Sequence, residues 1–326
     1  MSDMPYTRLG RTDLSVSRIC LGTWQFGGDW GSVEREEVKG AVRRALELGI
    51  NFFDTAQAYG LGESEALLAE ALEGKAGDDE VVVATKGGLR RTGSGIERDS
   101  SREWLRRGVE ESLRNLDVEA IDLYQVHWPD PDTPLEETTG ALRELRDEGK
   151  IRHVGVSNFG VPELEEFERT LPVETVQPPY HLFRRDIEED VLPWSRERDV
   201  GVLIYGPLAH GLLSGRMDAD WRPTEGDWRN GSPLFRGDAF RRNLEVVDEL
   251  RRFADERGIP VPELAVAWTL AQPGVHAAIV GARRSAHIEG TAPAAALELD
   301  DDDLAELERI MEAAVAVEGP SPEQRV

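Results

Sequence analysis

Four side chains that could do chemistry follow three apolar, strand-like runs of the chain. The runs cover residues 50–53, 81–85 and 121–126. In chain order, the four side chains are Asp54, Tyr59, Lys86 and His127. The C-terminal ends of the strands in a parallel α/β barrel share one face, and that face carries the chemistry. The pattern therefore predicts that these four side chains meet at one site.

Together the four side chains fit proton transfer to a carbonyl oxygen. A free tyrosine has a pKa of about 10 and is a poor acid near neutrality. A lysine ammonium beside the Tyr59 oxygen would stabilise the phenolate and lower that pKa, while Asp54 would keep Lys86 charged and in place. Such a tyrosine can protonate a carbonyl oxygen as hydride reaches the carbonyl carbon. His127 can hydrogen-bond the same oxygen and orient it.

Eight strand-like runs alternate with helical patterns, which predicts a parallel sheet closed into a (β/α)8 TIM barrel. The strands are expected at 19–24, 50–53, 81–85, 121–126, 152–156, 173–177, 201–205 and 277–280. Helices are expected near 38–48, 63–72, 101–116, 134–148, 162–169, 186–198, 238–257, 262–272, 286–296 and 301–314. Residues 1–326 are interpreted as one domain, with a short leading hairpin, extra helices near the C-terminus and a disordered tail from about residue 317.

A doubly wound sheet is the alternative fold for this alternation. It is disfavoured because no strand-to-helix turn carries a full Gly-x-Gly-x-x-Gly motif. The nearest match, residues 60–65, lacks the third glycine and is a weak signal.

Composition narrows the classes of partner and the location. A formal net charge of −25 argues against nucleic acid or anionic lipid as the main partner. The N-terminus has no basic and apolar signal-peptide pattern, no run reaches the ~18 apolar residues of a membrane span, and the one cysteine, Cys20, fits a reducing cytoplasm. With only four lysines and such an excess of acid, the chain is expected to be adapted to high salt, which screens like-charge repulsion.

Seven motifs in order make the chain, from about residue 6 to residue 310, similar to the aldo-keto reductases. They are Gly22-Thr23-Trp24, residues 54–60 (DTAQAYG), Ala84-Thr85-Lys86, residues 125–130 (QVHWPD), residues 155–159 (GVSNF), residues 177–180 (QPPY) and residues 205–208 (YGPL). The subgroup that the chain most resembles contains bacterial general-stress and inositol-utilisation reductases. The resemblance implies that Asp54, Tyr59, Lys86 and His127 are the catalytic tetrad, with Tyr59 as the proton donor.

The resemblance also implies a nicotinamide cofactor site. Ser157, Asn158 and Gln177 match the residues that bind the carboxamide, and Tyr205 matches the ring that stacks on the nicotinamide. The floor near the nicotinamide and the loop over the pyrophosphate correspond to Gly22, Thr23, Trp24, Gly206, Leu208, Gly211, Leu212 and Ser214.

After the last strand, residues 281–284 open a helix whose N-terminus can hold phosphate. NADP(H) is the expected cofactor, with NAD(H) possible, because Arg283 and Arg284 can meet the 2′-phosphate together with Gly281 of the same turn. Arg284, nearer the helix start, is expected to contribute more than Arg283. The family usually has Gln or Arg, and four residues later Asn, in this helix. Here His287 and Thr291 stand at those places, so the adenine contacts depart from the family pattern.

Trp24, Tyr59, His127 and Trp128 are expected to line the substrate pocket, which suggests an apolar or aromatic carbonyl compound. Further aromatic residues lie in loops that either reach this pocket or pack on the barrel: Trp30, Trp221, Trp228 and Phe235.

The expected activity is reduction of an aldehyde or ketone. Two alternatives remain open: a polyol or sugar dehydrogenase acting through the same residues, and a cofactor-binding, redox-sensing regulatory subunit with little turnover. No metal site is expected, and a barrel hydrolase is disfavoured because no metal-ligand spacing or paired strand-end carboxylates are present.

Overall fold

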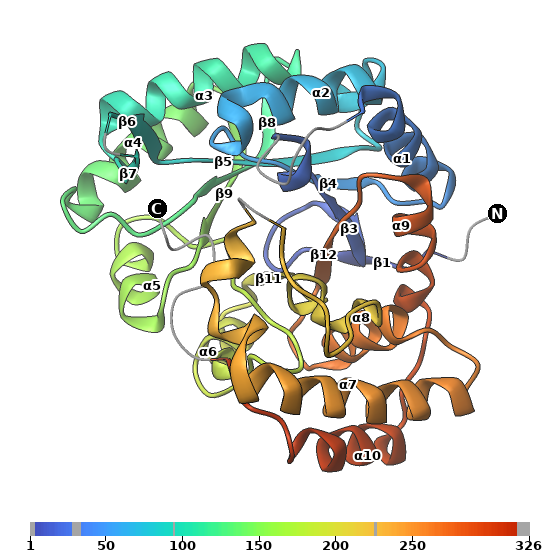
Figure 1. Cartoon of the computed structure of the whole chain (residues 1–326). Coiled ribbons are helices and arrows are strands. Elements are labelled where there is room, and N and C mark those ends of the chain that lie inside the picture. Colours follow the sequence, from blue (N-terminus) through green and yellow to red (C-terminus); the bar gives the residue numbers. More distant parts are fainter. Residues whose placement is uncertain (1–3, 28–33, 94, 225–226, 318–326) are drawn as a thin grey trace.

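The chain folds into a closed barrel of eight parallel strands surrounded by helices (Figure 1). The computed structural model describes residues 4–27, 34–93, 95–224 and 227–317. Around the barrel the strands are β3 (Ile19–Gly22), β4 (Phe52–Asp54), β5 (Val82–Gly87), β8 (Ile121–Val126), β9 (Ile151–Ser157), β10 (Thr175–Gln177), β11 (Gly201–Tyr205) and β12 (Ala277–Gly281). The predicted (β/α)8 barrel is therefore confirmed, and its C-terminal strand ends form one rim.

Helices follow the strands where the apolar periodicity predicts them. They are α1 (Arg35–Glu47), α2 (Glu63–Leu72), α3 (Arg102–Leu116), α4 (Leu135–Asp147), α5 (Val161–Glu168), α6 (Val191–Glu197), α7 (Gly237–Glu256), α8 (Val261–Ala271), α9 (Ser285–Glu289) and α10 (Asp301–Met311). At the start of α10, Asp300 and Asp303 form a reciprocal capping box, which satisfies backbone N–H groups that a helix start leaves unpaired.

Two of the expected helices are shorter than the sequence predicted. The expected helix 186–198 is divided into a short turn, Asp186–Glu188, and α6, because the Asp190 carboxylate accepts from the Val191 N–H and starts a new helix. The expected helix 286–296 is divided into α9 and the turn Ala292–Ala295. Pro293 lies in that second turn and has no N–H with which to continue α9.

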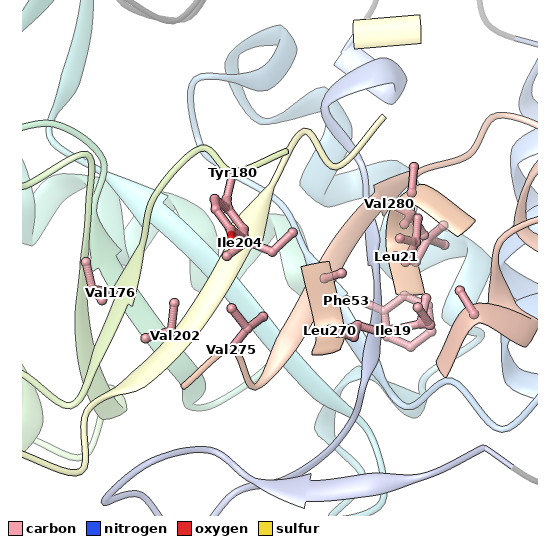
Figure 2. Close-up of a cluster of buried hydrophobic side chains, with 14 of the residues drawn as sticks. Ile19, Leu21, Phe53, Val176, Tyr180, Val202, Ile204, Leu270, Val275 and Val280 are labelled. Atoms are coloured by element: carbon pink, nitrogen blue, oxygen red, sulfur yellow. The ribbon is translucent and has the colours of Figure 1, made fainter. Parts of the chain in front are cut away.

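Alternation along the strands builds an outer and an inner apolar layer. In β3, Ile19 and Leu21 face the helices, whereas Cys20 belongs to the cluster inside the barrel. Figure 2 shows the outer layer, with Ile19, Leu21 and Phe53 on neighbouring strands. The expected burial of Cys20 is confirmed, so its role is packing.

The predicted leading hairpin is confirmed, and it packs on the N-terminal end of the barrel. Its strands are β1 (Tyr6–Arg8) and β2 (Ser15–Ser17), and Leu9, Leu14 and Val16 join the inner cluster with the barrel strands. The hairpin therefore acts as a plug for the end of the barrel opposite the predicted site.

A second hairpin, which the sequence pattern did not predict, lies between β5 and α3. It pairs β6 (Leu89–Thr92) with β7 (Gly95–Arg98) and lies at the edge of the molecule near α4 (Figure 1).

Within the described part of the chain, no helix combines the length and the apolar character that crossing a bilayer requires. The tail expected to be disordered lies, from residue 318, outside the described residues.

Candidate active site

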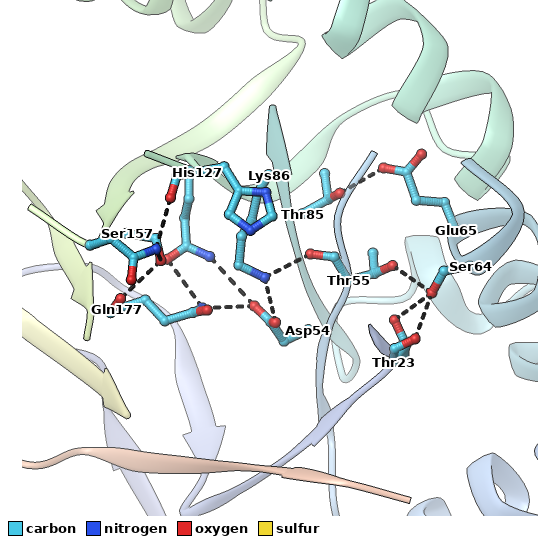
Figure 3. Close-up of polar contacts among 12 residues, drawn as sticks. Thr23, Asp54, Thr55, Ser64, Glu65, Thr85, Lys86, His127, Ser157 and Gln177 are labelled. Atoms are coloured by element: carbon cyan, nitrogen blue, oxygen red, sulfur yellow. Dashed lines mark hydrogen bonds and ion pairs between the residues drawn. The ribbon is translucent and has the colours of Figure 1, made fainter. Parts of the chain in front are cut away.

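The structure brings the predicted tetrad together at the C-terminal rim of the barrel. Asp54 ends β4, Lys86 lies near the end of β5, and His127 directly follows β8. The Lys86 ammonium donates to Asp54 Oδ1 at 2.5 Å and to the Thr55 carbonyl at 2.9 Å (Figure 3). The same ammonium lies 5.3 Å from the centroid of the Tyr59 ring. The buried cation therefore binds the carboxylate and lies close to the Tyr59 ring.

Asp54 is held from its other side by amide groups. Its Oδ2 accepts from Gln177 Nε2 at 2.8 Å and from Gln125 Nε2 at 3.5 Å. The side chains of Asp54 and Lys86 are 4% and 1% exposed. A buried ion pair is tolerated when further hydrogen bonds satisfy its remaining donors and acceptors. This network fixes the position of Lys86.

His127 lies against Tyr59 as a neutral imidazole. The two ring centroids are 5.8 Å apart, and the rings are nearly perpendicular at 79°. Burial, together with the nearby Lys86 ammonium, lowers the pKa of His127 well below its ordinary value of 6.5. Its Nδ1 is buried and has no hydrogen-bond partner among the described residues. His127 is therefore suited to orient an oxygen by hydrogen bonding and unsuited to deliver a proton near neutrality.

The residues expected to hold a carboxamide form a second network beside the tetrad. Asn158 donates to the His127 carbonyl and to Ser157 Oγ, both at 3.0 Å, while its Oδ1 accepts from the Tyr205 hydroxyl at 2.8 Å. Ser157 Oγ donates to the Gln177 carbonyl at 2.9 Å. Asn158 has a positive φ of 64°, a conformation that asparagine tolerates better than most residues. The network ties the ends of β9, β10 and β11 together.

A cavity of about 380 Å³ opens from the tetrad towards α9. Asp54 and Tyr59 line its inner end. Most of the residues predicted to bind the cofactor also line it: Gly22, Thr23, Trp24, Gln177, Tyr205, Gly206, Leu208, Gly211, Ser214, Gly281, Arg283, His287 and Thr291. Most of the predicted cofactor residues therefore share one cavity with Asp54 and Tyr59, while Lys86 and His127 do not line it.

The outer end of the cavity is basic, although the chain as a whole carries a charge of −25. Arg216, Arg229 and Arg283 line it, and Asp54 at the inner end is the only acid among the described lining residues. Arg229 is paired with Asp227 at 2.6 Å. His287 Nδ1 accepts from the Arg283 N–H at 3.4 Å. Guanidinium groups gathered in one cavity of an acidic protein are suited to holding an anionic group.

Glycines allow the chain to run close to the cavity. Gly206 and Gly211 have φ values of 70° and 104°, which residues with a Cβ adopt at a cost. A Cβ on Gly22 would lie 2.7 Å from Ile279 Cγ2, a distance that requires the neighbour to move. The loop after β11 and the end of β3 therefore depend on glycine for their shape.

Some predicted residues lie outside the lining of the cavity. Arg284 is exposed and donates to Glu37 of α1 at 2.9 Å. Leu212 is fully buried in the core. Ser157 and Asn158 lie behind the lining, in the second network.

The aromatic residues separate into those near the site and those that pack loops. Trp24 is half-buried and lies 6.4 Å from Tyr59 between ring centroids. Trp128 is buried beneath the Arg98 guanidinium, 5.3 Å from its ring, and does not line the cavity. Trp221 packs with Phe235 and Phe240 at 5.6 Å and 6.0 Å between ring centroids, which is the loop-packing role. Trp30 and the side chain of Trp228 lie outside the described residues.

Sequence reasoning missed several residues that line the cavity. The polar ones are Gln25, His210, Arg216 and Arg229. Three of them, His210, Arg216 and Arg229, lie in the irregular stretch after β11, which has no apolar periodicity to place it. For the two arginines, charge was the available signal, because a basic side chain near a predicted phosphate loop is notable in a chain with this excess of acid.

The family assignment rests on comparison with known proteins. Residues 18–312 match the model of the Aldo/keto reductase family. The chain belongs to the aldo-keto reductase family. It is 39% identical over 315 residues to the aldo-keto reductase YhdN of Bacillus subtilis, covering 96% of this chain and 95% of the relative.

Other relatives of this aldo-keto reductase differ in the function stated for them. The NADH-specific methylglyoxal reductase of Escherichia coli is 32% identical over 321 residues, covering 94% of this chain and 98% of the relative. The structure of the glycerol dehydrogenase AKR11B4 from Gluconobacter oxydans has a TM-score of 0.89 and 37% identity, covering 97% of this chain and 98% of that one. The predicted family and barrel are confirmed. Among the described residues, no cluster of three or more histidine, cysteine or acidic side chains could hold a metal ion.

Proposed function

We propose that this aldo-keto reductase is an NADP(H)-dependent carbonyl reductase that converts aldehydes or ketones to alcohols, with Tyr59 as the proton donor. The observation that carries the proposal is the single cavity that joins Asp54 and Tyr59 at one end to Arg283 at the other. A reductase needs a proton donor and a dinucleotide phosphate site in one connected space, and a cavity with Tyr59 at one end and arginines at the other supports this arrangement. A cytoplasmic location and a small-molecule substrate are parts of the same proposal.

The residues of the cavity fit a nicotinamide cofactor. When bound, such a cofactor supplies hydride to the carbonyl carbon. Gln177 and Tyr205 line the cavity and offer an amide for its carboxamide and a ring for its nicotinamide. Asn158 and Ser157 lie directly behind that wall, bonded to Tyr205 and Gln177, and are proposed to take part in holding the carboxamide. The positive-φ glycines of the loop after β11 leave room for a pyrophosphate, and the arginines would hold its phosphate charge.

Protein side chains handle the proton in the proposed reaction. Tyr59 would donate its hydroxyl proton to the carbonyl oxygen, and the nearby Lys86 ammonium would stabilise the phenolate that remains. Neutral His127 would hydrogen-bond the same oxygen and fix its direction. The low pKa of His127 supports Tyr59 as the acid, because the imidazole has no extra proton to give near neutrality.

NADP(H) and NAD(H) are the two cofactors to distinguish. Three arginines in the cavity of a chain with a charge of −25 support NADP(H), because its 2′-phosphate adds close to two negative charges. The relative named as an NADH-specific methylglyoxal reductase shows that NADH use occurs among proteins 32% identical to this chain. The dissociation constants of NADPH and NADH should therefore be measured first.

Polyol oxidation is the second candidate function. It is favoured by the similarity to the solved glycerol dehydrogenase, at 37% identity. The same residues would serve it in reverse, with Tyr59 as the base. A ratio of kcat/KM for aldehyde reduction to kcat/KM for polyol oxidation decides between the two directions.

The test is the Tyr59→Phe variant. We expect kcat for aldehyde reduction to fall by about 10²–10⁴, the usual contribution of positioned acid catalysis, with NADPH binding unchanged. Tyr6→Phe is the matched control, because Tyr6 is exposed on the N-terminal hairpin and its hydroxyl donates to the Gly49 carbonyl. Normal kcat in Tyr59→Phe would overturn the proposal. Tight NADPH binding without turnover in the wild type would favour a redox-sensing role.

A further inference from the structure

Two buried polar residues at the start of α2 take no part in the proposed proton transfer. Ser64 and Glu65 are completely buried. Figure 3 shows both side chains pointing from α2 towards the ends of the strands that carry the tetrad. A buried carboxylate is unfavourable unless hydrogen bonds satisfy it. The complete burial of the Glu65 carboxylate therefore requires a structural or functional explanation.

Glu65 binds the strand segment that carries Lys86. Its Oε1 accepts from the Thr85 hydroxyl at 2.6 Å, and its Oε2 accepts from Asn115 Nδ2 at 3.0 Å. Successive residues of a strand point to opposite faces, so Thr85 faces the helices while Lys86 faces the barrel interior. Burial raises the pKa of Glu65, and the bonds from Asn115 and Thr85 oppose that rise. Through Thr85, Glu65 fixes the backbone from which Lys86 projects.

Ser64 binds the two strand ends on the other side of Lys86. Its hydroxyl donates to the Thr23 carbonyl at 2.9 Å and lies 2.7 Å from Thr23 Oγ1 and 3.1 Å from Thr55 Oγ1. The Thr55 carbonyl in turn accepts from the Lys86 ammonium at 2.9 Å. Two consecutive residues of α2 thus hold the ends of β3, β4 and β5.

The connection from Tyr59 to α2 is strained. Gly60, Leu61 and Gly62 have φ values of 61°, 56° and 92°. The left-handed conformation costs about 1–2 kcal/mol for a residue such as leucine, and such strain persists only where the surroundings impose it. A Cβ on Gly60 would lie 2.7 Å from the Gly27 carbonyl oxygen, so the turn is also tightly packed. Ser64 and Glu65 anchor its far end.

We propose that Glu65, through Thr85, is a positioning residue that holds the Tyr59 phenol and the Lys86 ammonium in register. Glu65 belongs to the helix that continues the Tyr59 turn, and Thr85 is the neighbour of Lys86. Their hydrogen bond is therefore a direct tie between the two segments that carry the acid and its partner. This inference rests on the proposed role of Tyr59 as the acid.

Thr85→Val tests the tie because valine has the shape of threonine and lacks the hydroxyl. We expect kcat for aldehyde reduction to fall about 10- to 100-fold, since a misplacement of about 1 Å can cost that much. The dissociation constant of NADPH should stay unchanged, because neither Thr85 nor Glu65 lines the cavity. The alkaline limb of the pH profile should move to higher pH, because a more distant ammonium stabilises the phenolate less.

Two matched variants separate positioning from packing. Thr85→Ser keeps the hydroxyl and should restore kcat and the pH profile. Thr175→Val makes the same change at a buried strand threonine whose hydroxyl has no partner among the described residues, and it should leave both unchanged. Glu65→Leu should lower kcat as Thr85→Val does, and the double variant should lose no more than the larger single effect, because both changes remove the same Glu65–Thr85 hydrogen bond.

The outcomes distinguish this inference from the proposed function. Wild-type kcat and pH profile in Thr85→Val, with only a lower melting temperature, would overturn the positioning role of Glu65. That result leaves the proposed function intact as long as Tyr59→Phe is inactive. An active Tyr59→Phe would instead remove the acid role itself. If Glu65→Leu does not fold, Thr85→Val and Thr85→Ser still decide the question.

Discussion

The inner and outer ends of the cavity are built in different ways. At the inner end, Asp54 and Lys86 are buried on adjacent strands and bind each other. Further bonds join Lys86 to the Thr55 carbonyl and Asp54 to Gln177 across the barrel. At the outer end, Arg216 and Arg229 lie in the long connection after β11, and Arg283 precedes the five-residue helix α9. Strands hold the proposed catalytic groups in one arrangement, whereas loops carry the arginines proposed to bind the cofactor phosphates. Changes at the inner end should therefore affect kcat, and changes at the outer end should affect affinity.

The largest expected effect is at the inner end, in Lys86→Met. We expect kcat to fall by about 10²–10⁴ because Tyr59 loses its charged partner, while the dissociation constant of NADPH stays unchanged. Removing Lys86 also leaves a buried Asp54 charge unpaired, which costs about 3–5 kcal/mol of stability. Steady-state kinetics, fluorescence titration with NADPH and thermal melting measure the three quantities.

Two controls accompany Lys86→Met. Lys75→Met changes an exposed lysine and should leave kcat and the melting temperature unaltered. The double variant Asp54→Asn, Lys86→Met should recover stability because no unpaired charge remains, but it should not recover kcat. Retention of kcat by Lys86→Met would contradict the division between the two ends of the cavity.

The next effect is at the outer end, and it compares two adjacent arginines. Arg283→Ala should weaken NADPH binding at least tenfold, since one charge-assisted hydrogen bond contributes about 1.5–3 kcal/mol. Arg284→Ala should have little effect, because its guanidinium is exposed and donates to Glu37. NADH binding should change little in either variant. Fluorescence titration of both cofactors measures this difference.

The structure thus predicts that Arg283 contributes more than Arg284 to NADPH affinity, which is the reverse of the expectation from the sequence. Equal losses of NADPH and NADH affinity in Arg283→Ala would show that Arg283 supports the fold or the adenine. A larger loss of NADPH affinity in Arg284→Ala would restore the original order. That second result would also show that the Arg284 guanidinium leaves Glu37 when the cofactor binds.

The inner end was predictable from the sequence because strands have a readable period. Apolar runs of four to six residues ended at Asp54, Lys86 and His127, and parallel strands in a barrel bring such ends to one face. The prediction required no knowledge of which residues far apart in the sequence contact each other. It followed from the position of each side chain relative to its own strand.

The outer end was less predictable because its contacts depend on distant parts of the chain. The partner of Arg284, Glu37, lies 247 positions away, and no local pattern pairs them. Arg216 and Arg229 lie in a stretch without periodicity, and the hairpin β6–β7 is too short and too charged to give a strand signal. The predicted lengths of the helices near Asp190 and Pro293 were wrong for a local reason. The capping side chain of Asp190 and the missing N–H of Pro293 interrupt helices that the apolar pattern would continue.

A smaller effect, on the whole fold, is expected from salt. With a net charge of −25 and four lysines, the melting temperature should rise as potassium chloride increases from about 0.1 M to about 1 M. Exposed arginine–carboxylate pairs are weakened by the same screening, but each contributes only about 0–1 kcal/mol. A flat or falling melting temperature would contradict salt adaptation.

The smallest effect concerns two histidines at the end of the barrel opposite the site. His153 binds Glu174 at 2.8 Å and Asp13 at 2.7 Å. Burial alone would lower the pKa of His153, but the bonds to these two carboxylates outweigh burial and raise it above 6.5. His276 Nδ1 instead accepts from the Val202 N–H at 3.1 Å, and burial lowers the pKa of this histidine. The two residues therefore contribute to stability in opposite pH ranges.

The sign of each effect follows from linkage between protonation and folding. The contribution of His153 is fully present below about pH 6.5, the unfolded value, and is lost as pH rises through its raised folded pKa. The contribution of His276 is present above about pH 6.5 and is lost as pH falls through its lowered folded pKa. His153→Gln should therefore reduce the melting temperature more near pH 6 than near pH 9, and His276→Gln more near pH 9 than near pH 6.

The environment of His153 contains further charges that keep their sign over this range. Arg146 of α4 lies 3.9 Å from Glu174, and Arg152 lies 3.1 Å from Asp122 on the neighbouring strand. His153 lies near the start of β9 and His276 directly precedes β12, so both are at the end of the barrel away from the tetrad. We therefore expect kcat and cofactor affinity to be unaltered in both variants. Parallel pH trends for the two variants would refute the opposite protonation states. A change in kcat in either variant would show that the plugged end of the barrel is coupled to the catalytic rim.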